Sequence, residues 1–460
     1  MSRADRFIVA APVAIAGVHG GLWALGRWPA RRTLAGDEQR YVHEARELAA
    51  GREVTVDLLW PPGYAEFLAG IARWADRWGV TTAIQIVLLI AGAACFAAFA
   101  RHLGAGRIAR RVVFLGLCCF PPLAAFAHYR WPEVLHLALF GAALWAFSTP
   151  QAALAVRAVG GAALGAALLT KSLLTPVAPL LLAALALGER GARRWLAPLA
   201  ATLAMGLVVA PTLVENHRAT GRWVIADSST FNLWLGLTDT SRRNLRDGRA
   251  WEEFKAYRDS APSAVERDRL LRARIREEVA RRGALDVLAA QIGRQGFRFF
   301  DKDSYLTDQL PGGALGGLGE GYPATPQPVA LGVRAVSYLA YAALLGLAAL
   351  GLVGTRTSWR RRENDILDED RGARQPINPW PWLALALVAF QIGLFLFLHV
   401  KTRYRVQLMP FLWIYAGLAA ERWIEQGRPA SNGRLVIGLV VGGGLLALAF
   451  GASLVDAMVS

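Results

Sequence analysis

This chain of 460 residues carries repeated apolar runs, each close to the length that crosses a bilayer. A membrane-spanning helix needs about 20 mostly apolar residues, because the hydrocarbon core is about 30 Å thick. The lengths of the apolar runs and the charged residues that separate them predict about eleven spans. We therefore expect an all-α polytopic membrane protein. The predicted spans cover residues 7–25, 80–100, 112–128, 133–149, 155–170, 172–187, 195–214, 329–353, 380–398, 406–420 and 434–455.

The net charge of +16 is explained by membrane orientation rather than by nucleic acid. Arginines gather in three loops, at 101–111, 188–194 and 356–374. Cytoplasmic loops carry an excess of Lys and Arg, and these three loops fall on one side if the spans alternate. We therefore place them in the cytoplasm, put the loop 26–79 and the insert 215–328 outside, and expect no nucleic-acid partner.

The long polar segments divide the chain into three predicted parts. Residues 1–214 form an N-terminal transmembrane module that includes the first external loop 26–79, and residues 329–460 form the C-terminal transmembrane helices. Between them, 215–328 has apolar residues at helical spacing and is predicted to be a small, mainly helical extracytoplasmic cap. Its glycine-rich end, 310–323, is predicted to be a flexible return to the membrane.

The first external loop carries apolar residues at helical spacing in two stretches. Tyr41, Ala45 and Leu48 lie in the first stretch, and Phe67 and Ile71 lie in the second, after a proline pair. Apolar residues at intervals of three to four positions are typical of an amphipathic helix. We predict two interfacial helices that lie along the membrane surface and contact membrane lipids.

An acidic pair, Asp37 and Glu38, opens the first of these predicted helices. A Gly-Asp sequence before a helical pattern is a normal helix start, so Asp37 is explained equally by capping. Asp37 and Tyr41 nevertheless share a helix face at i, i+4, which places a carboxylate beside an aromatic ring. A base that activates a hydroxyl could stand there.

Two ionisable residues stand at the ends of predicted spans. Glu133 follows Pro132, as an acid in the first turn of a helix often does, but the topology places it on the same side as Asp37. Lys171 lies between two apolar runs in LLTKSLLTP, where an ammonium must snorkel, form an ion pair or face a polar cavity. Both are candidates for chemistry as well as for structure.

Basic and aromatic residues also gather in the short external loop 399–405. Lys and Arg are normally depleted from short loops on the outer side, so an anionic ligand is expected to meet them. The candidate binding residues are His399, Lys401, Arg403 and Tyr404.

No nucleotide-binding or metal-binding signature occurs in the sequence. It has no Walker or dinucleotide glycine loop, no HExxH motif and no pair of cysteines at metal-ligand spacing. The three cysteines, Cys95, Cys118 and Cys119, all lie in apolar runs. We assign no metal ligands and no certain cofactor, and leave a divalent metal ion open.

Six short motifs, in this order along the chain, carry a resemblance to a known family. With them the chain resembles the GT-C superfamily of integral-membrane glycosyltransferases, in particular bacterial relatives of protein O-mannosyltransferases and of the lipid A aminoarabinose transferase. The motifs are GDEQRY (36–41), WPPGYAEFLAG (60–70), RWPEVLHLALF (130–140), LLTKSLLTP (168–176), TFNLWLG (230–236) and KTRYRVQLMPFL (401–412).

The resemblance implies an activity and roles for the candidate residues. It implies transfer of a sugar, with inversion, from a polyprenyl-phosphate donor to an extracytoplasmic acceptor in the cell envelope (a glycan, lipid or protein), at the bacterial inner membrane. Asp37 and Glu38 match the acidic pair that holds the family's catalytic Asp, and Glu133 matches a second acid. The resemblance places Lys171 and the segment 401–404 near the lipid phosphate.

Two other functions fit the same sequence. A lipid or polysaccharide flippase or transporter would explain the spans and the cations, although transporters tend to show repeated halves with broken helices near the mid-membrane. A non-catalytic assembly partner would keep the fold without the activity. Loss of activity on changing Asp37 would separate the enzyme from the assembly partner.

Overall fold

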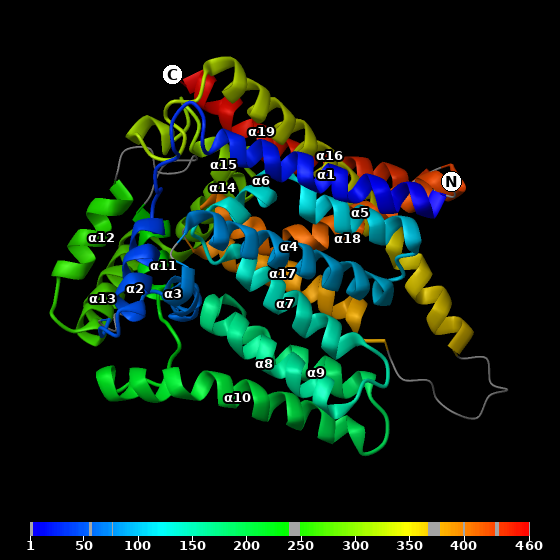
Figure 1. Ribbon diagram of the computed structural model, residues 1–460, viewed down its shortest axis with the longest axis horizontal. Coiled ribbons are helices and arrows are strands. Elements are labelled where there is room, and N and C mark those ends of the chain that lie inside the picture. Colours follow the sequence, from blue (N-terminus) through cyan, green and yellow to red (C-terminus); the bar gives the residue numbers. More distant parts are fainter. Residues whose placement is uncertain are drawn as a thin grey trace.

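The computed structural model describes residues 3–54, 58–75, 77–238, 249–366, 378–398, 401–427 and 432–459. Within these ranges every regular element is a helix, and the long helices lie side by side in one bundle (Figure 1). The all-α prediction is therefore confirmed for the described part of the chain.

The helices before the insert supply the larger share of the bundle. They are α1 (Arg3–Leu25), α4 (Trp78–Ala100), α5 (Arg107–Cys119), α7 (Glu133–Ser148), α8 (Leu154–Thr170), α9 (Ala178–Gly188) and α10 (Arg193–Thr220). The helices after the insert complete it. They are α16 (Gln327–Ile366), α17 (Trp380–Phe397), α18 (Met409–Gln426) and α19 (Asn432–Val459).

Five helices in the described ranges are long and apolar enough to cross a membrane, and a sixth is added if one bent pair counts as a single span. Large apolar side chains such as Trp195 and Leu207 on α10 are exposed, as contact with lipid requires. The prediction of an integral membrane protein is thus supported by length and composition, whereas eleven spans stay a prediction. The five are Trp78–Leu103, Arg193–Thr220, Gln327–Gly354, Trp380–Phe397 and Gly433–Gly451.

The expected span 112–128 is not one straight helix. α5 ends at Cys119, and the chain continues as α6 (Pro121–Ala124) and a 3-10 turn, η2 (Ala125–His128), bent by 53° from α5. Phe120 is extended, with φ −65° and ψ 112°, because the residue before a proline is driven out of the helical region. A proline also lacks the N–H that would continue the α5 ladder.

Two further predicted spans begin in a 3-10 turn. A 3-10 segment, η3 (Ser172–Val177), precedes α9, and another, η5 (Thr402–Gln407), precedes α18. Each starts directly after a candidate lysine, Lys171 or Lys401. The apolar helical stretch Ser172–Gly188 agrees with the predicted span 172–187, while α18 starts at Met409, three residues after the predicted start at 406.

The two predicted surface helices are present as α2 (Glu38–Ala49) and α3 (Gly63–Ala75), packed against each other. Their apolar faces meet through the rings of Tyr41 and Tyr64, whose centroids are 5.2 Å apart. Gly63 is required at the start of α3, because a Cβ there would lie 2.8 Å from the carbonyl oxygen of Leu169 on α8. This close approach fixes α3 on the end of the bundle.

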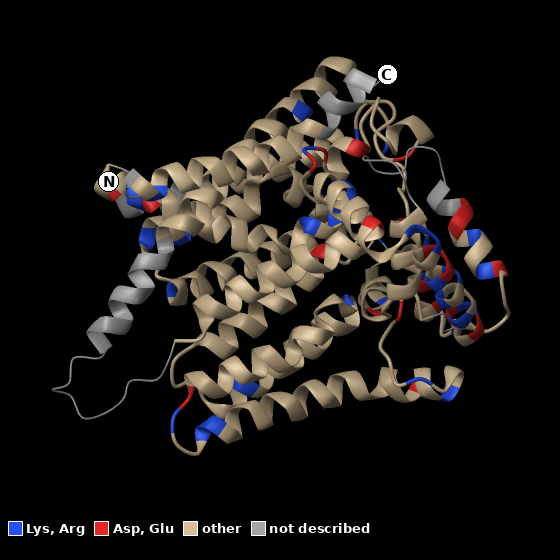
Figure 2. Ribbon diagram, turned by 180° about the vertical axis from the view of Figure 1, so that it is seen from behind, with Lys and Arg blue, Asp and Glu red and all other residues tan. Residues whose placement is uncertain are grey.

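The insert contains α11 (Ser229–Thr238), α12 (Arg249–Asp259), α13 (Ala264–Arg282), α14 (Ala284–Phe300) and the single turn α15 (Tyr305–Asp308). Charged residues gather on α12 and α13, while the bundle helices are mostly uncharged (Figure 2). α10 runs on to Thr220, so no helix ends at the predicted boundary after residue 214. α14 packs against α17 and α19, and the three-part division of the chain stays a prediction.

The glycine-rich segment 310–323 lies against the first external loop, and its predicted role as a flexible return to the membrane stays a prediction. The Thr33 N–H donates to the Gly321 carbonyl at 2.8 Å, and the Gly36 N–H donates to Glu320 Oε2 at 2.8 Å. The glycines allow this packing, since Gly321 has φ +78° and a Cβ there would lie 2.4 Å from Gln309.

Candidate functional site

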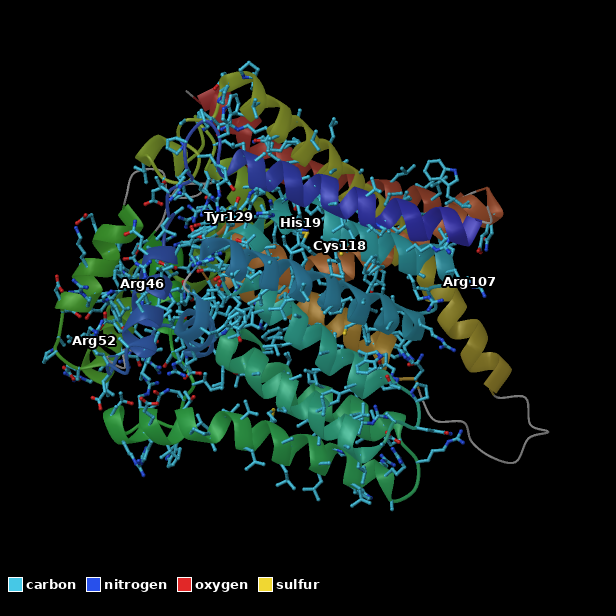
Figure 3. All side chains as sticks on the ribbon, in the orientation of Figure 1. His19, Arg46, Arg52, Arg107, Cys118 and Tyr129 are labelled. Atoms are coloured by element: carbon cyan, nitrogen blue, oxygen red, sulfur yellow. The ribbon has the colours of Figure 1, made fainter. Side chains whose placement is uncertain are left out.

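A large cavity opens between α2, α7 to α10, the insert and η5, with a volume of about 2560 Å³. It lies toward the end of the molecule where Figure 3 shows Arg46 and Arg52, away from the end that holds Arg107. Segments up to about 370 residues apart in sequence meet here. The predicted site residues that line it are Asp37, Tyr41, Glu133, Lys171, Lys401, Arg403 and Tyr404.

Asp37 stands at the N-terminus of α2, and its side chain pairs with Arg403, which lies 366 residues later in the sequence. Its Oδ2 accepts from the Arg403 guanidinium at 2.9 Å, and its side chain makes no capping hydrogen bond to α2. Capping therefore does not explain this carboxylate. Gly36 before it has φ +58°, a left-handed conformation that glycine adopts readily, which turns the chain into α2.

The charges around Asp37 keep its carboxyl group ionised. Burial by itself would raise the pKa of Asp37, but Arg403, Lys401 and Arg40 outweigh burial and hold the pKa below its usual value. An ionised carboxylate can accept a proton from an incoming hydroxyl. The same cations form a positive surface for an anion.

Arg403 is held in place by aromatic rings as well as by Asp37. Its guanidinium carbon lies 3.9 Å from the ring centroid of Trp131 and 5.3 Å from that of Tyr404. Nε of Arg403 is buried and has no hydrogen-bond partner among the described residues. A stacked guanidinium with an unused N–H is well suited to bind an oxyanion.

Glu133 and Lys171 form a second ion pair in the same cavity. Lys171 Nζ donates to Glu133 Oε1 at 3.0 Å, and Glu133 is buried. Lys171 therefore forms an ion pair at the cavity, which is one of the three environments expected for it, and does not snorkel. Glu133 Oε2 has no partner among the described residues.

Glu38 does not line the cavity, although it is adjacent to Asp37 in sequence. Its carboxylate accepts from the Arg32 guanidinium, from the Ala35 N–H at 2.8 Å and from the Arg130 N–H at 2.6 Å. These bonds tie the loop before α2 to the segment before α7. This environment suits a positioning role for Glu38 rather than the catalytic role expected from the sequence.

The two tyrosines of the predicted site are held by ring contacts. Tyr41 packs edge-on against Tyr64 and Trp131, and burial, the largest effect, raises the pKa of its hydroxyl. Tyr404 stacks on Phe395 with 5.3 Å between centroids, and its ring lies 5.9 Å from the Lys171 ammonium. Tyr404 thus connects η5 to the Glu133–Lys171 pair. His399 lies outside the described residues.

Several polar residues of the cavity were not predicted, among them Asp308, Glu320 and Gln407. Asp308, at the end of α15, accepts from the Thr402 hydroxyl at 3.2 Å, and burial together with Asp303 and Asp301 raises its pKa to about 7. Glu320 lines the cavity from the glycine-rich segment, and Gln407 lines it from the end of η5. No motif or spacing marks Asp308 or Glu320 in the sequence, because their positions depend on how the chain folds after α14, whereas Gln407 lies within the motif 401–412 but carries no charge that singles it out.

One side of the cavity is apolar and is built by helices of the bundle. This wall adjoins the segment that carries Lys171. The cavity thus has a charged end and an apolar end, and this combination is suited to bind an anionic amphiphile. The wall includes Leu168 of α8, Leu182 of α9, Met205 and Val209 of α10, and Leu394 and Phe395 of α17.

Among the described residues, no group of three or more His, Cys, Asp or Glu side chains could hold a metal ion.

Comparison with known proteins gives a limited result. No family model matches the chain, and no curated protein matches it. Among solved structures the chain is similar to the crystal structure of ArnT from Cupriavidus metallidurans bound to undecaprenyl phosphate. The two share 17% sequence identity, the match covers 96% of this chain and 77% of that one, and the TM-score is 0.36. A likeness at this level carries no argument about the present chain.

Proposed function

We propose that this protein is a membrane-embedded glycosyltransferase of the GT-C kind, which uses a polyprenyl-phosphate-linked sugar as its donor. The observation that carries the proposal is the linked set of two carboxylates and three cations in one cavity, next to an apolar wall. Asp37 pairs with Arg403, Glu133 pairs with Lys171, and Lys401 lines the same cavity.

The donor's two chemical parts match the two sides of the cavity. Lys401, Lys171 and the unused N–H of Arg403 offer charge-assisted hydrogen bonds to a phosphate. The wall from α8, α9, α10 and α17 offers contact with an isoprenoid chain. A lipid-linked donor would reach the cavity from the bilayer and would need no nucleotide-binding domain.

The reaction needs one base and a stabilised leaving group. Asp37 takes the proton of an acceptor hydroxyl, and the oxygen of that hydroxyl forms a bond to the anomeric carbon. At the same time the bond from the anomeric carbon to the phosphate oxygen breaks. The electron pair leaves with the polyprenyl phosphate, whose charge the cations stabilise. Attack from the face opposite the phosphate inverts the anomeric configuration.

The insert supplies the side of the cavity that faces away from the bundle. Phe254 and Arg258 of α12 and Arg267 of α13 line it there. In the proposed orientation this end is extracytoplasmic, at a bacterial inner membrane, and the insert selects an acceptor of the cell envelope. The acceptor is a glycan, a lipid or a protein.

A comparison of donors tests this function. Membranes that contain the protein and its native acceptors are incubated with labelled undecaprenyl-phosphate sugars or with labelled nucleotide sugars. The proposal predicts transfer from the lipid-linked donors alone. Transfer from the nucleotide sugars only, or movement of the intact lipid across the bilayer without any transfer, would contradict it.

A further inference from the structure

Gln407 combines burial, a cavity position and unused hydrogen-bonding atoms. Only 2% of the residue is exposed, and neither Oε1 nor Nε2 has a hydrogen-bond partner within the described ranges. Burying an amide without partners is costly, so such a group in a native protein calls for an explanation. Because Gln407 lines the cavity, a bound ligand can supply the missing partners.

Gln407 ends η5 and lines the same cavity as the Glu133–Lys171 pair. In a 3-10 helix the side chains at i and i+3 are eclipsed, so Gln407 follows Tyr404 on one face. The Tyr404 ring lies 5.9 Å from Lys171 Nζ, which in turn binds Glu133 Oε1 at 3.0 Å. Glu133 lines the cavity as well, and its Oε2 likewise has no partner among the described residues.

The chemistry of these unused atoms restricts the ligand. Gln407 offers one acceptor oxygen and an NH₂ donor, whereas an ionised Glu133 offers only an acceptor. A phosphate oxyanion brings acceptors and cannot satisfy either oxygen. A sugar hydroxyl is both donor and acceptor, so neighbouring hydroxyl groups of a pyranose or furanose ring fit both residues.

We infer that Gln407 and the free oxygen of Glu133 form a subsite that recognises hydroxyl groups of the sugar on the lipid-linked donor. This inference rests on the proposed function and adds the residue that distinguishes the glycosylated lipid from the bare lipid phosphate. Gln407 is then a specificity residue, and the cations bind the phosphate that both lipids share.

The chain offers a matched control on α17. Gln391 is also fully buried, and both of its amide atoms lack partners in the part of the chain that the structure describes, but it does not line the cavity. Gln407→Met and Gln391→Met remove the same chemical group with little change in volume. Since each removes an unsatisfied buried amide, neither should lower thermal stability. Gln407→Leu serves as a second variant at the site.

The test measures binding to the full-length protein in lipid nanodiscs. The ligands are undecaprenyl phosphate and the same lipid carrying glucose, mannose, galactose or arabinose. Wild type and Gln391→Met should bind at least one glycosylated lipid about tenfold more tightly than undecaprenyl phosphate, the scale of one or two added hydrogen bonds. In Gln407→Met this preference should fall to about threefold or less, with unchanged affinity for undecaprenyl phosphate.

Each other outcome is informative. If wild type binds none of these lipids, the proposed function itself fails. If wild type prefers no sugar over the bare lipid, or if both Gln407 variants keep the wild-type preference, the sugar subsite is wrong while a polyprenyl-phosphate site stands. An equal loss of affinity for the bare and glycosylated lipids would make Gln407 a phosphate-site or structural residue and also overturn the inference.

Discussion

The Lys171 ammonium lies 3.0 Å from Oε1 of Glu133, a carboxylate that is itself buried. The Glu133 side chain has no water to replace its partner, so its charge depends on Lys171, which is itself 16% exposed at the cavity. Lys171→Met should therefore destabilise the protein by about 3–5 kcal/mol, the usual result of leaving a buried charge unpaired. Thermal unfolding in detergent measures the loss.

The double variant separates this structural effect from ligand binding. Lys171→Met with Glu133→Gln removes both charges and should recover most of the lost stability. Its affinity for undecaprenyl phosphate should stay about tenfold or more below wild type, because a charge-assisted hydrogen bond to phosphate is missing. Recovery of stability together with wild-type lipid affinity would remove Lys171 from the phosphate site.

Glu38 should matter more for stability than its neighbour Asp37 does. Glu38→Gln replaces a carboxylate that accepts from Arg32 and two backbone N–H groups, and the new NH₂ group would face one of these donors. We expect a loss of about 3 kcal/mol, as for a broken buried ion pair. Glu47→Gln, at an exposed ion pair with Arg52, is the control and should unfold close to the wild-type temperature. Equal stability of the two variants would contradict the buried network.

Asp308 should make stability depend on pH. Its pKa is raised to about 7, by burial and by Asp303 and Asp301, so the folded protein keeps a proton that the unfolded chain releases near pH 4. The contribution of this group is therefore fully present below about pH 4 and is lost as the pH rises to about 7. Each pKa unit corresponds to about 1.4 kcal/mol.

Asp308→Asn tests this dependence, because the amide is uncharged at every pH. The variant should unfold at a higher temperature than wild type at pH 8, and the difference should shrink as the pH falls from 7 toward 4. A difference that is the same at all pH values, or a less stable variant at pH 8, would show that Asp308 is not held protonated.

Much of the helical framework and several of the residues that form the site could be predicted from the sequence. Apolar runs reveal spanning helices because the bilayer sets their length, and unpaired charges at the ends of such runs stand out because lipid cannot solvate them. That is why Asp37, Glu133, Lys171 and Arg403 could be named before their ion pairs were known. Alternation of the predicted spans was enough to expect these four residues on the same side of the membrane.

The remainder depends on tertiary packing that periodicity does not encode. The break at Phe120 and the fold of the glycine-rich segment follow from local backbone chemistry and from contacts with distant loops. Asp37 and Glu38 cannot be told apart by sequence, since adjacent helix residues point in different directions and only the fold decides which one meets Arg130. Gln407 carries no charge, so nothing in an apolar stretch marked it as a cavity residue.

In the proposed reaction Asp37 is the base beside a lipid-phosphate site, and Asp37→Asn removes the base while it keeps the shape of the side chain. The carboxamide oxygen can still accept from Arg403, so folding and undecaprenyl phosphate affinity should stay near wild type. The rate of sugar transfer should fall, because an amide cannot take a proton from the acceptor hydroxyl.

The measurement is the rate of sugar transfer from a labelled undecaprenyl-phosphate sugar to acceptors in native membranes, with lipid affinity determined on the same variant. We predict a rate about 100-fold or more below wild type, the usual scale for losing a general base, at unchanged lipid affinity. A transfer rate close to wild type in Asp37→Asn would contradict the account and assign the Asp37 carboxylate to its ion pair with Arg403 alone.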